Sequence, residues 1–168
     1  MAHNMYQEPG GEDQVYFAES ALLKQQGHEV LNYETHNNRI DSMNRLELIG
    51  KTLWNASVYR ELETLIRDER PDVVHFHNTF PLISPSGYYV AKSEGIPVVQ
   101  TLHNYRLLCP DALFFRDGGV CEDCMGKPIP WPGVIHKCYR GSRAGSGVVA
   151  GMLTMHRALR TWTNTVDV

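Results

Sequence analysis

Apolar residues recur along much of the chain at the three-to-four-residue spacing of helices that bury one face. Residues 12–26 show this spacing, with Val15, Ala18 and Leu22 on one face, acids in the first turn and Gly27 where a helix would end. The pattern therefore predicts a helix at residues 12–26 that packs through that apolar face. Helices are also predicted at residues 44–69 (one long helix or two short ones), 84–94 and 144–160.

Short β-rich runs lie between these helices. They cover residues 28–34, 72–78 and 96–104. Alternation of strand and helix is typical of βαβ units, so the sequence predicts a Rossmann-like, three-layer α/β domain with a mostly parallel sheet. In such sheets ligands bind outside the carboxyl ends of the strands. Two runs end there in polar pairs, His77-Asn78 and His103-Asn104.

The start of the chain fits this pattern less well. Gly10 and Gly11 lie in a Pro-Gly-Gly loop at which a first strand would pass into the first helix. Only residues 1–8 precede that loop, and they are polar and poor in strand-forming types. Two interpretations follow: the residues of a first strand lie upstream of Met1, or the strand is short or the segment disordered.

Composition narrows the class of protein. Hydrophobic residues make up 42% and charged residues 21%, which is enough apolar material for a folded core. The net charge of -3 argues against a general nucleic-acid binder. There is no apolar run of 18 residues and no signal-like segment at Met1, so we expect a cytoplasmic protein. Residues 125–168 hold a single acid, Asp167, so a basic surface that meets phosphate or anionic lipid is one interpretation and ordinary charge clustering the other.

The cysteines are confined to one window. Cys109, Cys121, Cys124 and Cys138 follow the pattern C-x11-C-x2-C-x13-C in a segment rich in glycine, proline and charge. Four thiolates can close a tetrahedral zinc site, and C-x2-C is the usual half of one, so we expect a structural zinc ion. Reduced thiols, an iron–sulfur cluster or a redox disulfide are the alternatives. His136 is a substitute ligand.

Taken together, these motifs resemble a known family. PGGED, PDVVHFHN, TLHNYRLLCP and HKCYRGSR, in this order, are similar to the N-terminal half of family 4 glycosyltransferases, over about residues 3–166. The resemblance implies a GT-B enzyme, in which two Rossmann-like domains face each other. It implies retaining transfer of a sugar from a nucleotide-sugar to a glycan or lipid-linked acceptor, of a hexosyltransferase type in surface polysaccharide assembly. The N-terminal domain would mainly take the acceptor.

The resemblance also implies roles for individual residues. His103 would lie beside the donor sugar as the catalytic residue, where a neutral imidazole can donate to a sugar hydroxyl. Which group takes the acceptor proton stays open, since the leaving phosphate is a candidate. Substrate-binding roles are implied for Gly10, Gly11, His77, Asn78 and Asn104. His75 shares a strand face with His77 but lies further from the strand end, so we expect a structural role for His75.

These expectations describe half of an enzyme. We expect residues 1–168 to form one N-terminal domain with a cysteine-rich insertion at about 105–141, and the C-terminal domain that holds most of the nucleotide-sugar to be absent. The fragment would then be inactive alone. The alternative is a non-catalytic, zinc-stabilised module that binds a sugar or a partner. The helix at 144–160 is either core-facing or a membrane-surface helix that meets a lipid-linked acceptor.

Overall fold

The computed structural model describes all residues, 1–168, and divides into two compact units. The sheet unit comprises Met1–His103 and Thr163–Val168, and the cysteine unit comprises Asn104–Trp162. The cysteine-rich segment expected at about 105–141 lies in the cysteine unit, which extends further, to Trp162.

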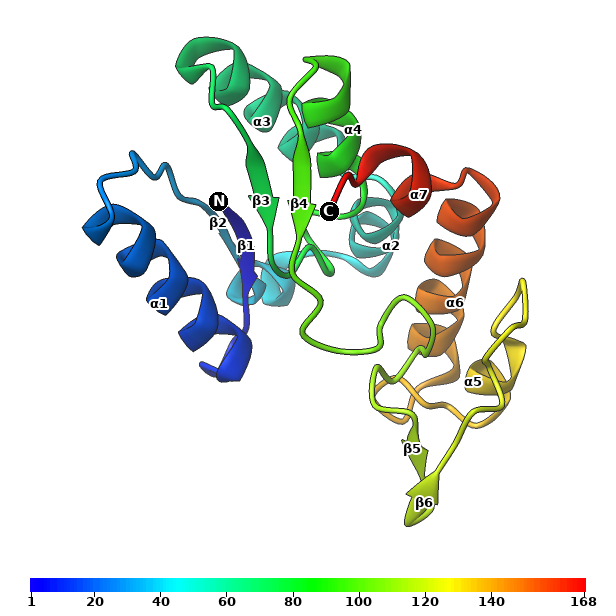
Figure 1. Cartoon of the computed structure of the whole chain (residues 1–168). Helices are drawn as coiled ribbons and strands as arrows, with labels where there is room; N and C mark the ends of the chain where they lie inside the picture. Colours follow the sequence, from blue (N-terminus) through cyan, green and yellow to red (C-terminus); the bar gives the residue numbers. More distant parts are fainter. The chain divides into compact units, whose positions relative to one another are not determined.

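The sheet unit is built on four parallel strands (Figure 1). The strand order is β2-β1-β3-β4, and β1 pairs along its length with β2, from Ala2 opposite Tyr33 to Met5 opposite His36. Their bounds are β1 (Ala2–Met5), β2 (Tyr33–His36), β3 (Val74–Phe76) and β4 (Val98–Gln100). The expected Rossmann-like α/β fold with a parallel sheet is therefore confirmed.

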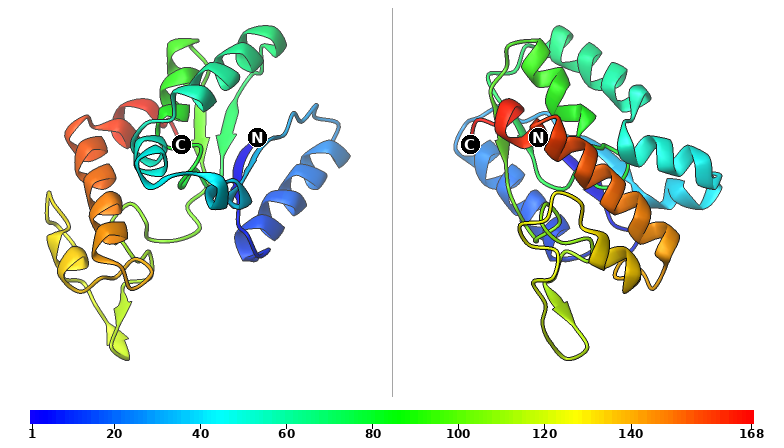
Figure 2. Two further views of the ribbon diagram at one scale, coloured as in Figure 1. Left: turned by 180° about the vertical axis from the view of Figure 1, so that it is seen from behind. Right: turned by 90° about the vertical axis from the view of Figure 1, so that its right-hand side faces the viewer.

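Helices cover both faces of this sheet (Figures 1 and 2). Phe76 of β3 points to one face, where its ring packs against Tyr88, whereas His75 points to the other face, beside Glu19 of α1. Successive strand residues face opposite ways, so α1 and α4 form separate layers around the sheet. The helices are α1 (Gly11–Gln25), α2 (Arg45–Leu53), α3 (Ala56–Glu69) and α4 (Ser86–Ser93), with a 3-10 turn at Asn37–Ser42.

The predicted 44–69 region forms two helices rather than one. Trp54 and Asn55 interrupt it, and Asn55 caps α3 by accepting the backbone N–H groups of Ser57 and Val58. Val58, Leu62 and Ile66 then recur at four-residue spacing and are all buried. Burying each such side chain contributes roughly 1.5–3 kcal/mol, so packing against its neighbours holds this helix in place.

The sheet unit selects one of the two interpretations of the chain's start and corrects two other expectations. The polar start forms a short strand: β1 spans Ala2–Met5, and all four residues are buried between two neighbours. The strand predicted at residues 28–34 begins later, at Tyr33. The helix predicted at 12–26 exists, but Val15 and Leu22 are exposed, and α1 instead buries Asp13, Tyr16 and Ser20.

The cysteine unit contains little regular structure. Its strands β5 (Phe115–Arg116) and β6 (Gly119–Val120) form a hairpin whose turn, Asp117-Gly118, has positive φ at both residues. Its helices are α5 (Trp131–Ile135) and α6 (Arg143–Ala158), while α7 (Thr161–Thr165) leads back to the sheet unit. The guanidinium of Arg157 on α6 donates to the carbonyls of Leu107 and Lys127, joining two loops.

The helix predicted at 144–160 corresponds to α6. It buries Val149, Met152, Leu153 and His156, whereas Leu159, the residue that follows α6, is exposed. This burial favours the core-facing interpretation of the helix. Across the whole structure, none of the helices combines the length and the hydropathy that crossing a bilayer needs.

Candidate functional site

The topology of the sheet marks one edge for ligand binding. The strand order reverses between β1 and β3, and ligands of open parallel sheets bind at the carboxyl ends of strands at such a point. The loop that carries Gly10 and Gly11 follows β1, and His77-Asn78 follows β3. Because the strands are parallel, these two predicted segments lie at the same edge, and His103 follows β4 on the same side.

The glycine loop is held by a buried acid that sequence reasoning overlooked. One carboxylate oxygen of Asp13 accepts the N–H of Gly10 at 2.7 Å, and the other accepts from His3 Nε2 at 2.7 Å. Both His3 and Asp13 are buried. Gly11 is exposed, and a Cβ built on it would meet no atom within 4 Å, so this glycine faces open space.

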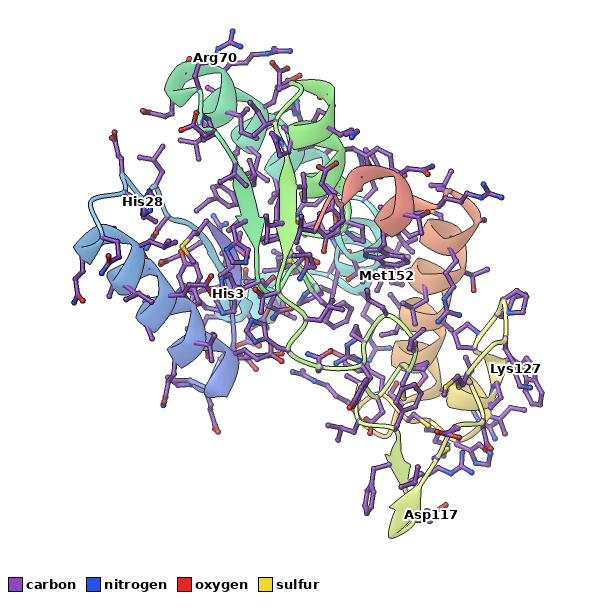
Figure 3. The ribbon with its side chains drawn as sticks, viewed as in Figure 1. His3, His28, Arg70, Asp117, Lys127 and Met152 are labelled. Carbon is purple, nitrogen blue, oxygen red and sulfur yellow. The ribbon has the colours of Figure 1, made fainter.

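The contacts of His3 fix its protonation. Its Nδ1 accepts the backbone N–H of Asn78, so the proton lies on Nε2 and is donated to Asp13. Burial lowers the pKa of His3 despite the opposing effect of Asp13, which agrees with a neutral ring. Figure 3 shows His3 between α1 and the sheet. This network ties β1, the glycine loop and the end of β3 together.

His77 and His103 form a second pair at this edge. Nδ1 of His77 lies 3.0 Å from Nε2 of His103, and the two rings stack with centroids 5.2 Å apart. The side chain of His77 is fully buried, whereas His103 is only partly covered. His103 is therefore the member of the pair that can reach a substrate, and His77 supports it from beneath.

The environment of His77 keeps its ring neutral. Burial lowers the pKa of His77 to about 3, and the neighbouring rings of His75, His103 and His3 reinforce this shift. Burial also lowers the pKa of His75. The carboxylate of Glu19 on α1 faces both rings, with one oxygen 3.4 Å from His75 Nδ1 and the other 3.5 Å from His77 Nε2.

The two predicted asparagines are engaged in local structure. The amide of Asn78 donates to the carbonyl of Asn4, and its oxygen accepts the N–H of Phe80, so Asn78 shapes the loop after β3. Asn104 begins the cysteine unit, where its side-chain oxygen accepts the N–H of Arg106. The substrate-binding roles implied for both residues stay predictions.

All four cysteines lie in the cysteine unit as free thiols. Burial raises the pKa of Cys124 and of Cys138, and for both of them negative charge on Cys109 raises it further, so the thiols are electrostatic neighbours. The three metal-ligating side chains whose donor atoms lie within 4.8 Å of one another are Glu19, His75 and His77 rather than any of the cysteines. Zinc at the cysteines therefore stays a prediction that rests on the residue types and their spacing along the chain.

Comparison with known proteins identifies the family of the chain. The sequence profile described as Glycosyltransferase Family 4 matches residues 9–117, and the chain belongs to this family. The chain is also 26% identical over 127 residues to an "Uncharacterized 42.6 kDa protein in cps region" of Klebsiella pneumoniae. That match covers 60% of this chain and 34% of the relative, so the chain spans about a third of that protein's length. No solved structure matches the chain.

Three site residues were missed by sequence reasoning: His3, Asp13 and Glu19. Asp13 carried a usable signal, because an acid three residues after the helix N-cap is typical of a capping box. His3 lay in a segment too polar to be recognised as a strand. Glu19 is one polar residue of an amphipathic helix, and only the packing of α1 on β3 brings it to the histidines.

Proposed function

We propose that this chain is the acceptor-side domain of a retaining glycosyltransferase that transfers a sugar, of the hexosyl type, from a nucleotide-sugar to a glycan or lipid-linked acceptor. Membership of family 4 supports a glycosyltransferase module. The observation that carries the residue-level proposal is the placement of His103 over the buried His77 at the carboxyl edge of the sheet. Most of the donor would be held by a second domain, and the fragment alone would not turn over.

In this proposal His103 acts as a hydrogen-bond donor. A retaining transfer develops positive charge on the sugar and negative charge on the departing diphosphate, and neutral donors that hold the sugar in place favour that transition state. Neutral His77 restricts the orientation of the His103 ring through the bond between Nδ1 of His77 and Nε2 of His103. The glycine loop held by Asp13 would leave room for the acceptor.

The test is made in the full-length enzyme that contains this domain. His103→Ala should lower kcat by roughly 10²-fold or more, with a much smaller change in acceptor KM, as for loss of one transition-state donor. The matched control is His28→Ala, because His28 is exposed beyond the far end of α1 (Figure 3). Equal turnover in the two variants would remove the catalytic role of His103.

We further propose a structural zinc ion at Cys109, Cys121, Cys124 and Cys138. Four soft thiolates including a C-x2-C pair are the donor set of closed structural sites, and the metal would stabilise a unit that has little regular structure. One zinc per chain by elemental mass spectrometry, retained in Val120→Ser and lost in Cys121→Ser, would support it. Val120 is the matched control because it is exposed beside Cys121. Four reactive thiols in a folded, metal-free chain would contradict it.

A second candidate function is a sugar-binding or partner-binding module without catalysis. Its supporting observation is that the four cysteines lie together in one compact unit, Asn104–Trp162, which a zinc ion could stabilise without any catalytic role. Cytoplasmic location and peripheral membrane contact stay predictions for either function. Saturable binding of an acceptor by the purified chain, with no sugar transfer by the full-length protein, would favour the binding module.

A further inference from the structure

Three side chains from two elements converge beneath the ligand edge of the sheet. Glu19 comes from α1, and His75 and His77 come from β3 and its end, with donor atoms that all lie within 4.8 Å of one another. The two carboxylate oxygens of Glu19 lie 3.4 Å from His75 Nδ1 and 3.5 Å from His77 Nε2. The family resemblance implies substrate binding for His77 by itself, and neither it nor the cysteine motif assigns a metal to these three side chains.

Hydrogen bonding alone explains the cluster poorly. The two distances exceed the 2.7–3.2 Å range of ordinary N–H···O bonds. Nε2 of His77 is buried and has no hydrogen-bond partner. A buried polar atom left unsatisfied is costly, so an atom placed in this way calls for a missing partner.

The opposite ring nitrogens are already engaged. Nε2 of His75 lies 2.8 Å from the hydroxyl of Thr101, and Nδ1 of His77 lies 3.0 Å from His103 Nε2. Metal-binding histidines usually donate their second ring N–H in this way, which fixes the ring and leaves the other nitrogen as a free lone pair. Here both remaining nitrogens face the same carboxylate.

The spacing also fits a single ion. Two donors each 2.0–2.1 Å from a tetrahedral Zn²⁺ are about 3.3 Å apart, close to the separations of 3.4 Å and 3.5 Å between the two imidazoles and the two oxygens of Glu19. The three donor atoms all lie within 4.8 Å of one another, so a bound ion would draw them closer together. Two imidazoles and one carboxylate form a donor set that binds zinc while leaving a coordination position open. Glu19 is 33% exposed and His75 13% exposed, so an ion can approach from their side.

We propose that Glu19, His75 and His77 form a binding site for a divalent transition-metal ion of the Zn²⁺ class. An ion on His77 Nε2 would supply the partner which that buried nitrogen lacks, and it would keep the proton of His77 on Nδ1. His77 then donates this proton to Nε2 of His103, which acts as the acceptor. The proton of His103 therefore lies on its other ring nitrogen, Nδ1, which becomes the donor and faces away from His77. The metal is thus a positioning element for His103, and the proposal stands on the geometry of the cluster whether or not the domain transfers sugar.

Co²⁺ is a suitable probe, because thiolate ligands produce near-ultraviolet charge-transfer bands and a His–Glu site does not. Chelator-stripped protein is titrated with Co²⁺ and followed by absorption. We expect two kinds of binding. Co²⁺ at the cysteines should produce charge-transfer bands, and Co²⁺ at Glu19, His75 and His77 should produce visible bands only. Glu19→Gln should weaken the second kind by at least about 10-fold and leave the first unchanged. Glu8→Gln is the matched control, because Glu8 is exposed and its substitution removes the same charge as Glu19→Gln. Identical titrations of Glu19→Gln and Glu8→Gln would overturn the proposal.

A second measurement separates metal binding from a merely structural role. Zn²⁺ should raise the Tm of Cys121→Ser, in which the cysteine set is broken, and this rise should vanish in Cys121→Ser combined with Glu19→Gln. Long-range ¹H–¹⁵N spectra of the histidines should show Nε2 of His77 shifting on Zn²⁺ addition. A Zn²⁺-independent Tm together with unshifted His77 nitrogens would overturn the proposal, even if Glu19→Gln lowers stability.

Discussion

Asp13 is the residue whose loss should most directly loosen the predicted substrate loop. Its carboxylate accepts from Gly10 N at 2.7 Å and from His3 Nε2 at 2.7 Å, in a position that is almost completely buried. Asp13→Ala removes both acceptors at once. Each hydrogen bond to a buried charged group is worth about 1.5–3 kcal/mol, and the His3 N–H would remain buried without a partner. We therefore expect the free energy of unfolding to fall by about 3–5 kcal/mol.

The assay is equilibrium urea unfolding followed by far-ultraviolet circular dichroism, with Glu8→Ala as the matched control. Glu8 lies in the same loop, is exposed, and carries the same charge, so its loss should cost less than about 0.5 kcal/mol. Amide hydrogen exchange at Gly10 and Gly11 should also accelerate in Asp13→Ala. Equal stability of the two variants would refute the view that Asp13 holds the loop through buried hydrogen bonds.

Three further predictions concern pH, packing and capping. Burial lowers the pKa of His77 to about 3 in the folded chain, whereas an unfolded histidine takes up its proton near pH 6.5. Below about pH 6.5 the unfolded state therefore binds one more proton, and chelator-treated protein should lose about 1.4 kcal/mol of stability per pH unit from this group, measured by urea unfolding. Gly133→Ala would place a Cβ 2.7 Å from the ring of Pro110 and should cost about 1–3 kcal/mol in the same assay. Asn55→Ala removes the cap of α3 and a buried bond to the Leu82 carbonyl, and should lower stability by about 2–3 kcal/mol.

Each of these has its own control. His77→Asn should show a shallower dependence of stability on pH, and an unchanged slope would contradict the assignment to His77. Gly151→Ala is matched to Gly133→Ala, because its Cβ would meet open space in α6 and should be neutral or stabilising. Asn44→Ala removes an exposed cap only, so a loss as large as that of Asn55→Ala would show that the buried bond contributes nothing.

Much of the sheet unit could be predicted from local patterns. Gly27 and Gly95 end their helices with positive φ where the sequence placed a helix end, and His77 and His103 follow strands as expected. These features depend on backbone preferences and on neighbours close in sequence, which a single chain displays directly. Three of the family motifs likewise reach the loops that follow β1, β3 and β4, whereas HKCYRGSR links α5 to α6.

The burial and contacts of the residues beneath the ligand edge could not be predicted from local sequence patterns, because they depend on tertiary structure. The sequence pattern predicts an apolar face on α1 that includes Val15 and Leu22. In the structure α1 instead buries Asp13 and Tyr16, because the sheet presents histidines to this helix rather than aliphatic groups. His3 is a polar residue inside a strand, which its own sequence neighbourhood does not predict. Its burial depends on hydrogen bonds to Asn78, 75 residues away, and to Asp13, 10 residues away.

The sequence by itself determined the class of fold, the family and the order of the motifs, because these follow from short-range periodicity and from residue types at strand ends. Only the tertiary structure decided which histidine is buried, which reaches the surface, and that Glu19 faces two imidazoles. The physical reason is that hydrogen bonding and burial of polar side chains are settled between elements. Their energies depend on partners that the linear pattern does not place side by side.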